Sequence, residues 1–225
     1  MVMLQIGSRI YQPVLTPSGF HVSLDPVEQG LWRHVWRLDA HFVPADEDYG
    51  SGADAHWEYW RFFVNPLGSF TTRDWRELVR DTFLENEAGH RELCLASLEN
   101  LINPYYTGKQ EMEVLLGELR VIRRDGYLFT VEADGEVERG KDHDERVPYG
   151  DFRLRAEIPF ASVTVEVPLN AGDPLAAAKA IAAREIQLTE FGRTDVLLYD
   201  PAIRRTWRPE RSGKHTVTLE VPWRE

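Results

Sequence analysis

Residues 39–58 are the densest group of side chains in this sequence that could bind a metal ion. A metal-dependent hydrolase needs several nitrogen or oxygen ligands that converge on one point. Strands expected at residues 33–43 and 55–64 would bring His41 close to His56 if they pair across the loop between them. A hydrolase with a metal-bound water as its nucleophile is therefore one hypothesis. Its candidate ligands are Asp39, His41, His56 and Glu58, in a group that also contains Asp46, Glu47, Asp48 and Asp54.

The same group has a simpler interpretation. No H-E-x-x-H motif occurs in it, and clusters without a motif are common on exposed loops. We favour an acidic loop in solvent, with the histidines and Glu58 on the hydrated face of a sheet. No resident cofactor is expected, and a divalent metal ion is the alternative that these residues suggest.

Other catalytic motifs are absent from the sequence or stand in the wrong context. The chain contains neither G-x-S-x-G nor a P-loop, and residues 50–55 fit a dinucleotide pattern without the strand-then-helix context that such a site needs. The single cysteine, Cys94, lies between two leucines, so we expect a buried, inert thiol. A Ser-His-Asp arrangement stays open, because its members can lie far apart in sequence.

Residues 55–64 are unusually aromatic and include Trp57, Tyr59 and Trp60. These three side chains could line a pocket for a small ligand, because Trp and Tyr combine flat apolar faces with polar edges. Central strands of a sheet select the same residue types, and both faces of this stretch are apolar. We therefore favour a core strand, with small-ligand binding as the alternative.

One basic stretch carries an aromatic residue among its arginines: Arg204, Arg205, Trp207 and Arg208. Such a stretch can stack on nucleic-acid bases or bind phosphate. The chain has 225 residues and a formal net charge of -11, which disfavours nucleic acid and anionic membranes as partners. We favour a loop whose arginines pair with carboxylates elsewhere in the chain, and the alternative is docking on an acidic protein surface, including one on another copy of this chain.

Alternation of apolar and polar residues predicts the strands that position these groups. Residues 152–158, 163–167 and 216–221 alternate without interruption, which is typical of strands with one buried and one hydrated face. The first two are expected to be separate strands joined around 159–161. Asp125-Gly126 predicts a tight turn between strands at 112–124 and 127–133. Residues 33–43 alternate as well, with an apolar face made of Trp36, Leu38, Ala40 and Phe42.

Two helices are expected to pack on the sheet. The first begins near Asp74 and the second at Asp173, where Asp can cap a helix that has proline in its first turn. The second should end near Gly192. Residues 91–102 fit a helix or a strand. The apolar stripe of the first helix consists of Trp75, Leu78, Val79, Thr82 and Phe83.

We therefore predict an α+β fold that is predominantly antiparallel β-sheet, sandwich-like or strongly curved, with two main helices packed on it. Residues 1–225 are expected to be one domain, with a weak boundary candidate within 139–150. No secretory signal or membrane span is expected, and the single cysteine indicates a reducing compartment, the cytoplasm. Because no catalytic motif stands out and aromatic anchors are plentiful, the favoured function is a non-enzymatic interaction or assembly module that forms homo-oligomers or binds a protein partner.

Overall fold

The computed structural model describes residues 3–27, 30–45, 60–65, 67, 74–79, 96–100, 110–141, 145–197 and 214–223. Most of these residues are in strands, as the alternating pattern predicted, and the strands form one ten-stranded sheet. In chain order the strands are β1 (Met3–Ile6), β2 (Arg9–Pro26), β3 (Trp32–Pro44), β4 (Trp60–Val64), β5 (Ala96–Asn100), β6 (Gln110–Asp125), β7 (Leu128–Lys141), β8 (Glu145–Pro168), β9 (Thr194–Leu197) and β10 (Lys214–Glu220).

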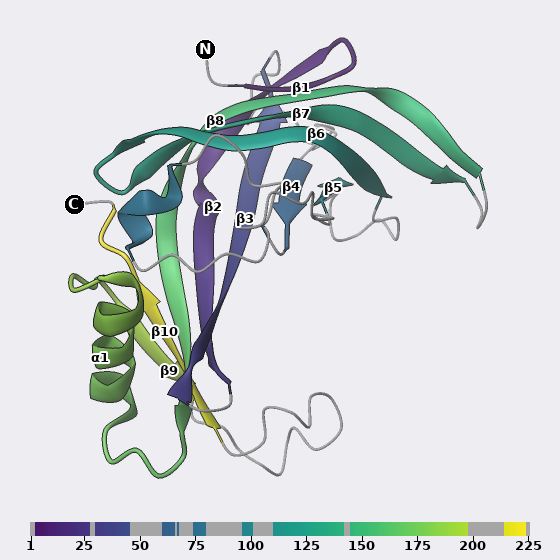
Figure 1. The fold of residues 1–225 in the computed structure, drawn as a ribbon. Helices are drawn as coiled ribbons and strands as arrows, with labels where there is room; N and C mark the ends of the chain where they lie inside the picture. The colour runs from purple at the N-terminus through teal and green to yellow at the C-terminus, as the bar shows by residue number, and fades with distance from the viewer. Residues whose placement is uncertain are drawn as a thin grey trace, which may run out of the picture.

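The sheet closes on itself through β8, the longest of these strands. The strand order is β1-β2-β3-β4-β5-β6-β7-β8-β10-β9, and β8 also pairs with β1 and β2. The β2–β8 pairing is parallel, and the other pairings among the described residues are antiparallel. Figure 1 shows β1, β6, β7 and the first part of β8 as an upper layer that crosses the steeper strands β2 and β3.

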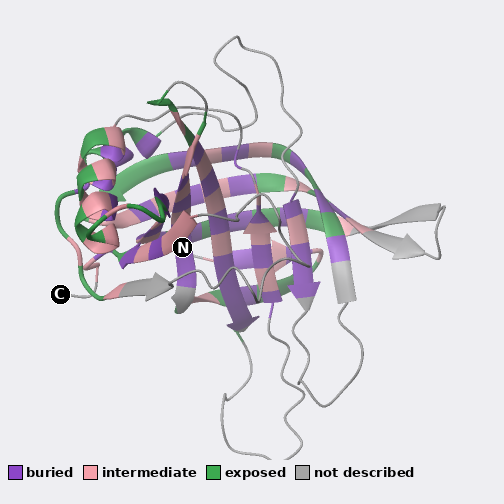
Figure 2. Cartoon of the chain, turned by 90° about the horizontal axis from the view of Figure 1, so that it is seen from below, coloured by how far each residue is buried: buried purple, intermediate pink, exposed green. Residues whose placement is uncertain are grey.

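Aromatic side chains fill the space between the two layers. Phe62 of β4 packs against Phe152 of β8 with ring centroids 4.9 Å apart, and Trp36 of β3 lies 5.7 Å from Phe160 of β8. All four side chains are fully buried. Burial of one such side chain stabilises the fold by roughly 2–3 kcal/mol. Figure 2 shows buried bands alternating with less buried ones along the strands, which is the period of two that the sequence predicted.

A bulge in β8 replaces the break that was expected around 159–161. The two alternating stretches belong to one continuous strand, and the expected join between separate strands is wrong. The register moves by one residue between the pairs Phe20–Phe160 and His21–Ser162, so Ala161 is the extra residue of the bulge. A Cβ atom on Gly19 would lie 2.5 Å from the Cβ of Ala161, so only glycine fits opposite the bulge.

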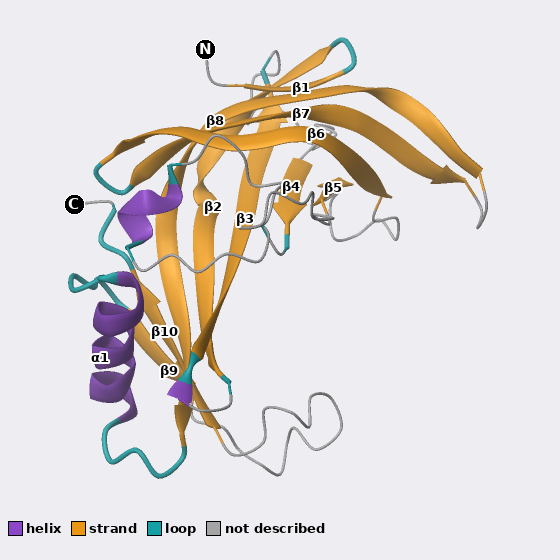
Figure 3. Ribbon diagram, in the orientation of Figure 1, coloured by secondary structure: helices purple, strands orange, loops and turns teal. Residues whose placement is uncertain are grey.

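The expected pair of main helices is wrong, because the described residues contain one α-helix, α1 (Pro174–Ile186). The other element, η2 (Trp75–Leu78), is a single turn of 3-10 helix that ends where Val79 becomes extended (Figure 3). Asp74 caps this turn by accepting a hydrogen bond from the backbone N–H of Arg76. Trp75 and Leu78 are buried, whereas Val79 is 42% exposed. One turn therefore places both buried side chains, and the stripe expected beyond it does not continue as a helix at Val79.

Helix α1 begins where the sequence predicted and ends earlier. The carboxylate of Asp173 accepts a hydrogen bond from the N–H of Ala176, 3.0 Å away. The helix ends at Ile186, not near Gly192, and its C-cap residue Gln187 has a left-handed φ of 56°. Its buried residues are Ala178, Ala182 and Ile186, and the small side chains of the two alanines suit close packing on β8 and β10.

Three smaller expectations are also resolved within the described residues. The uncertain stretch 91–102 contains a strand at 96–100, and the rest of it lies outside the described residues. The hairpin turn lies at Gly126 and Tyr127, one residue later than expected, because Asp125 pairs with Leu128. The boundary candidate at 139–150 falls on the β7–β8 pairing, which continues as far as Lys141 and Glu145. No helix within the described ranges has the length and apolar character needed to cross a bilayer.

Candidate functional site

The structure brings together two of the four proposed metal ligands. Asp39 and His41 lie two residues apart on the outer face of β3, with the Nε2 of His41 3.0 Å from Oδ1 of Asp39. His56 and Glu58 lie outside the described residues, as do Trp57 and Tyr59. The basic stretch with Arg204, Arg205, Trp207 and Arg208 lies outside them too.

Arg61 of β4 binds both oxygens of the Asp39 carboxylate. Its Nε lies 2.8 Å from Oδ1 and 3.0 Å from Oδ2, and its Nη2 also donates to Oδ2. The Nη1 of Arg61 lies 3.3 Å from Glu99 of β5, so the network crosses three strands. Burial acts to raise the pKa of Asp39, but hydrogen bonds from Arg61 and His41 outweigh it and bring this pKa down to about 2.

This network has the chemistry of a structural polar cluster. A metal ion bound at Asp39 and His41 would have to displace Arg61 from both carboxylate oxygens. Among the described residues no group of three or more His, Cys, Asp and Glu side chains is placed to hold a metal ion. The hydrolase hypothesis thus depends on His56 and Glu58 and stays a prediction.

A second polar contact joins His21 of β2 to Ser162 of β8. The Nδ1 of His21 lies 2.8 Å from the Oγ of Ser162. Burial lowers the pKa of His21, although Asp39 acts in the opposite direction, so the ring is mainly neutral near pH 7. A neutral histidine beside a serine has the geometry of a base and a nucleophile. Within the described residues, however, no hydrogen bond joins Asp39 to His21, so the third member of a triad is missing.

The sequence could not reveal this pair, because its members are 141 residues apart and meet through the parallel β2–β8 pairing. Trp60, proposed as a ligand-binding residue, is placed in the core. It is 3% exposed and makes an edge-to-face contact with Tyr11, with ring centroids 6.1 Å apart. The aromatic stretch is therefore a core strand at this position, as the favoured interpretation has it.

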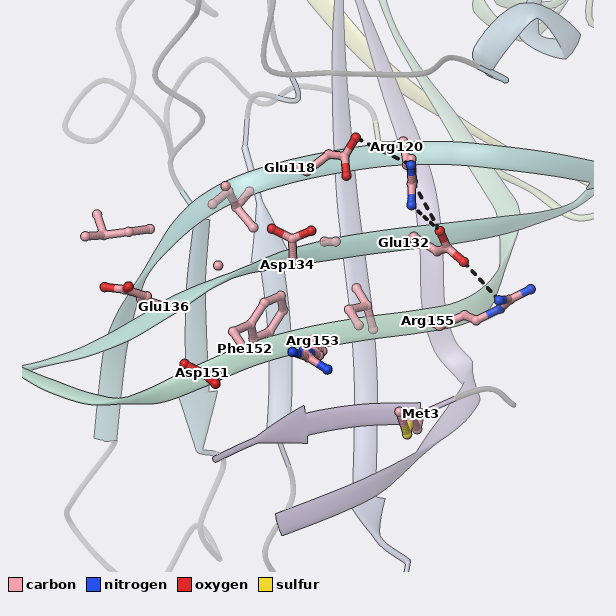
Figure 4. Close-up of a pocket in the computed structure, with 16 residues that line it drawn as sticks. Met3, Glu118, Arg120, Glu132, Asp134, Glu136, Asp151, Phe152, Arg153 and Arg155 are labelled. Atoms are coloured by element: carbon pink, nitrogen blue, oxygen red, sulfur yellow. Dashed lines mark hydrogen bonds and ion pairs between the residues drawn. The ribbon is translucent and has the colours of Figure 1, made fainter. Parts of the chain in front are cut away.

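An open groove lies on the outer face of β6, β7, β8 and β1 (Figure 4). Its volume is about 770 Å³. Five carboxylates and three guanidinium groups line it, so its formal charge is -2. We refer to it as the outer groove, and its charged residues are Glu118, Arg120, Glu132, Asp134, Glu136, Asp151, Arg153 and Arg155.

One end of the outer groove is neutralised by ion pairs. Glu132 of β7 accepts from Arg120 of β6 at 2.9 Å and from Arg155 of β8 at 3.0 Å. These three residues lie directly opposite one another in the sheet register. Glu118 lies 3.5 Å from Arg120 and joins the same network. Figure 4 shows these contacts as a continuous row across the three strands.

The other end carries charges that the described residues leave unpaired. Asp134, Glu136, Asp151 and Arg153 are exposed, and none of them forms an ion pair with another described residue. Three carboxylates and one guanidinium group therefore face solvent side by side. This end is suited to a partner that presents positive charge.

Two glycines shape this part of the outer groove. A Cβ atom on Gly135 of β7 would overlap the backbone carbonyl oxygen of Leu115 on β6. A Cβ atom on Gly117, which is the extra residue of a bulge in β6, would lie 2.8 Å from Oδ1 of Asp134. The two strands thus approach each other more closely than side chains allow, and the bulge bends the sheet there.

The sequence contained part of the signal for this surface. The alternation at 152–158 places Arg153 and Arg155 on the hydrated face, but it does not say which strands lie beside them. The register between β6, β7 and β8 is needed to show that the charges lie side by side.

Comparisons of this chain with known protein families, curated proteins and solved structures find no match.

Proposed function

We propose that this protein is a non-enzymatic interaction module that self-associates in the cytoplasm, and that the outer groove receives the basic stretch 204–208 of a second copy. The observation that carries the proposal is the unpaired acidic end of the groove. Asp134, Glu136 and Asp151 have no ion-pair partner among the described residues. Arginine side chains of a partner would supply the missing positive charge.

The charge of the basic stretch complements the charge of the groove. Arg204, Arg205 and Arg208 carry three positive charges within five residues, whereas the groove has a formal charge of -2. Arginine suits such a surface, because its planar guanidinium binds a carboxylate through two hydrogen bonds. Opposite charges across an interface also accelerate association and select against other partners.

The dimensions of the groove support the same partner. Its volume of about 770 Å³ is large enough for several side chains of an extended segment. Along an extended segment, alternate side chains lie about 7 Å apart, which is also the spacing of the carboxylate residues Asp134 and Glu136 along β7. The exposed part of Leu115 offers an apolar contact beside the charges for the ring of Trp207.

Sedimentation velocity over a range of protein concentrations tests the proposal. The wild-type chain is expected to form a species larger than its 26.0 kDa monomer as concentration rises. Added salt should weaken this association, because exposed charges are screened. A sample that stays monomeric at every concentration, at low salt, contradicts the proposed function.

Two double variants locate the surface. Glu136→Gln with Asp151→Asn removes two exposed groove charges with little change of shape, and should raise the dissociation constant about tenfold. Glu77→Gln with Glu220→Gln removes two exposed carboxylates outside the groove and is the matched control. Equal association of both double variants would show that the groove is not the surface used.

A further inference from the structure

A small pocket on another part of the molecule has the opposite charge. It lies between the tip of the β6–β7 hairpin, η2 and the residues that follow α1, and its volume is about 210 Å³. Arg76, Arg124, Tyr127 and Glu190 line it together with Trp75. We refer to it as the hairpin pocket. None of its lining residues belongs to the outer groove.

Aromatic stacking holds both arginines of the hairpin pocket in place. The ring of Trp75 stacks on that of Tyr127 with centroids 5.0 Å apart and an interplanar angle of 15°. The guanidinium carbons of Arg76 and Arg124 lie 5.1 Å and 5.4 Å from the centroid of the Trp75 ring. Cation–π contacts of this kind orient a guanidinium group without using its hydrogen-bond donors.

Most of those donors stay available. Arg76 donates one hydrogen bond to Asp74 at 3.1 Å, and Arg124 donates one to the backbone carbonyl of Gly126 at 2.9 Å. Each guanidinium group has five N–H donors. Because both residues line the pocket, their remaining donors are available to an acceptor there.

The carboxylate of the pocket is already engaged. Glu190 accepts a hydrogen bond from the Tyr127 hydroxyl at 2.8 Å. Burial raises the pKa of Tyr127, and the contact with Glu190 adds to this, so the hydroxyl stays protonated as the donor. Neither arginine forms an ion pair with Glu190 among the described residues. Arg76 forms an ion pair with Asp74 at 3.1 Å, whereas Arg124 has no ion-pair partner among the described residues, so Arg124 is the cation of the pocket that is left to bind an anion.

Trp75 contributes a further unsatisfied donor. It is 3% exposed, and its buried Nε1–H has no hydrogen-bond acceptor among the described residues. A buried donor without an acceptor destabilises a fold. Trp75 lines the pocket, so an oxygen-bearing ligand there would lie beside the residue that carries this donor.

We infer that the hairpin pocket binds a small oxyanion, held between Arg76 and Arg124 against the rim of the Trp75–Tyr127 stack. The shared chemistry is an oxygen-centred negative charge, as in a carboxylate or a phosphate. Arginine pairs recognise both through parallel hydrogen bonds. This site is independent of the proposed self-association, because it shares no residue with the outer groove.

The test uses inorganic phosphate and acetate as probes on the full chain labelled with nitrogen-15. The indole N–H signal of Trp75, assigned by its loss in Trp75→Phe, is followed at constant ionic strength with chloride as the balancing anion. A saturable shift of this signal with phosphate, acetate or both supports the inference, and the probe that saturates identifies the class of oxyanion. The absence of a saturable shift with either probe overturns it.

A matched pair of variants ties the shift to the pocket. Arg124→Gln removes one pocket charge and should weaken binding about tenfold. Arg123→Gln changes the neighbouring arginine, which is 66% exposed and does not line the pocket, and should leave the affinity within about twofold. Both positions are exposed, so both variants are expected to fold. Equal affinity of the two variants would overturn the assignment to this pocket.

Discussion

Arg61 binds Asp39 across neighbouring strands, with its Nε 2.8 Å from one carboxylate oxygen and 3.0 Å from the other. Because His41 contacts the same carboxylate at 3.0 Å, Asp39 is held by two positively charged or donating partners on the outer face of the sheet. These contacts explain why charged and titratable side chains lie close together at this place. The side chains form hydrogen bonds with one another where the sheet is partly buried, so their polar groups are not left without partners.

The first prediction concerns acid stability. The folded pKa of Asp39 is about 2, below its ordinary value of 3.8, so the unfolded chain binds the proton more readily between these values. The stability due to the ionised group is present above about pH 4 and is lost as pH falls toward 2. We expect this group to contribute about 2 kcal/mol to the free energy of unfolding at neutral pH.

Denaturant titrations of wild type and Asp39→Asn at several pH values measure this contribution. The difference in free energy of unfolding should be largest at neutral pH and should shrink as pH falls through the window. Asp125→Asn removes a carboxylate that is 83% exposed and controls for loss of charge. Parallel stability curves for wild type and Asp39→Asn would contradict the account of this ion pair.

The second prediction concerns the close approach of β6 and β7. Gly135→Ala places a methyl group on the backbone carbonyl of Leu115, which cannot move without shifting β6. The free energy of unfolding should fall by about 2 kcal/mol or more. Gly172→Ala is the control, because nothing lies within 4 Å of its new methyl group. If thermal melts give the two variants equal stability, β6 and β7 do not approach each other closely at Gly135.

Local patterns predicted strands well and long-range pairing poorly. The alternation at 216–221 and 33–43 depends on neighbouring residues alone, and these stretches are strands. The closure of the sheet depends on pairs such as Val22 with Val163, which no local pattern encodes. The helix expected at Trp75 illustrates the same limit. Contacts of its ring with Tyr127 and Phe160 accompany a single turn rather than a full helix.

Prediction of the candidate surfaces was limited for the same reason. Acidic and basic residues of the outer groove are spread over β6, β7 and β8, so only the register shows that Glu132 lies between Arg120 and Arg155. The candidate metal ligands at 39–58 could be proposed from the sequence because they are close together in it. Its described part forms an ion-pair network, and its remaining members lie outside the described residues.

The third prediction concerns the end of α1. Gln187 has a φ of 56°, which is unfavourable for a residue with a side chain and is natural for glycine. Gln187→Gly should raise the free energy of unfolding by about 0.5–1 kcal/mol. Gln187→Ala removes the same side chain while keeping the strain, so it should give no such gain. A chemical denaturation series of the three proteins checks this, and equal stability of Gly and Ala variants would contradict it.

The fourth prediction concerns divalent metals. Because Arg61 holds both carboxylate oxygens of Asp39, zinc or manganese added to chelator-treated protein should leave the melting temperature unchanged. Differential scanning fluorimetry with wild type and His56→Ala measures this. A rise in melting temperature for wild type that is lost in His56→Ala would instead favour the metal-assisted hydrolase.

Complementary charge reversal tests the proposed self-association most directly. One variant carries Glu136→Lys and Asp151→Lys in the outer groove, and the other carries Arg204→Glu and Arg208→Glu in the basic stretch. Each variant alone should sediment as a monomer, while an equimolar mixture should form a mixed complex, because the new charges are again opposite. A mixture that remains monomeric under conditions in which the wild-type chain associates would contradict the pairing of groove and stretch.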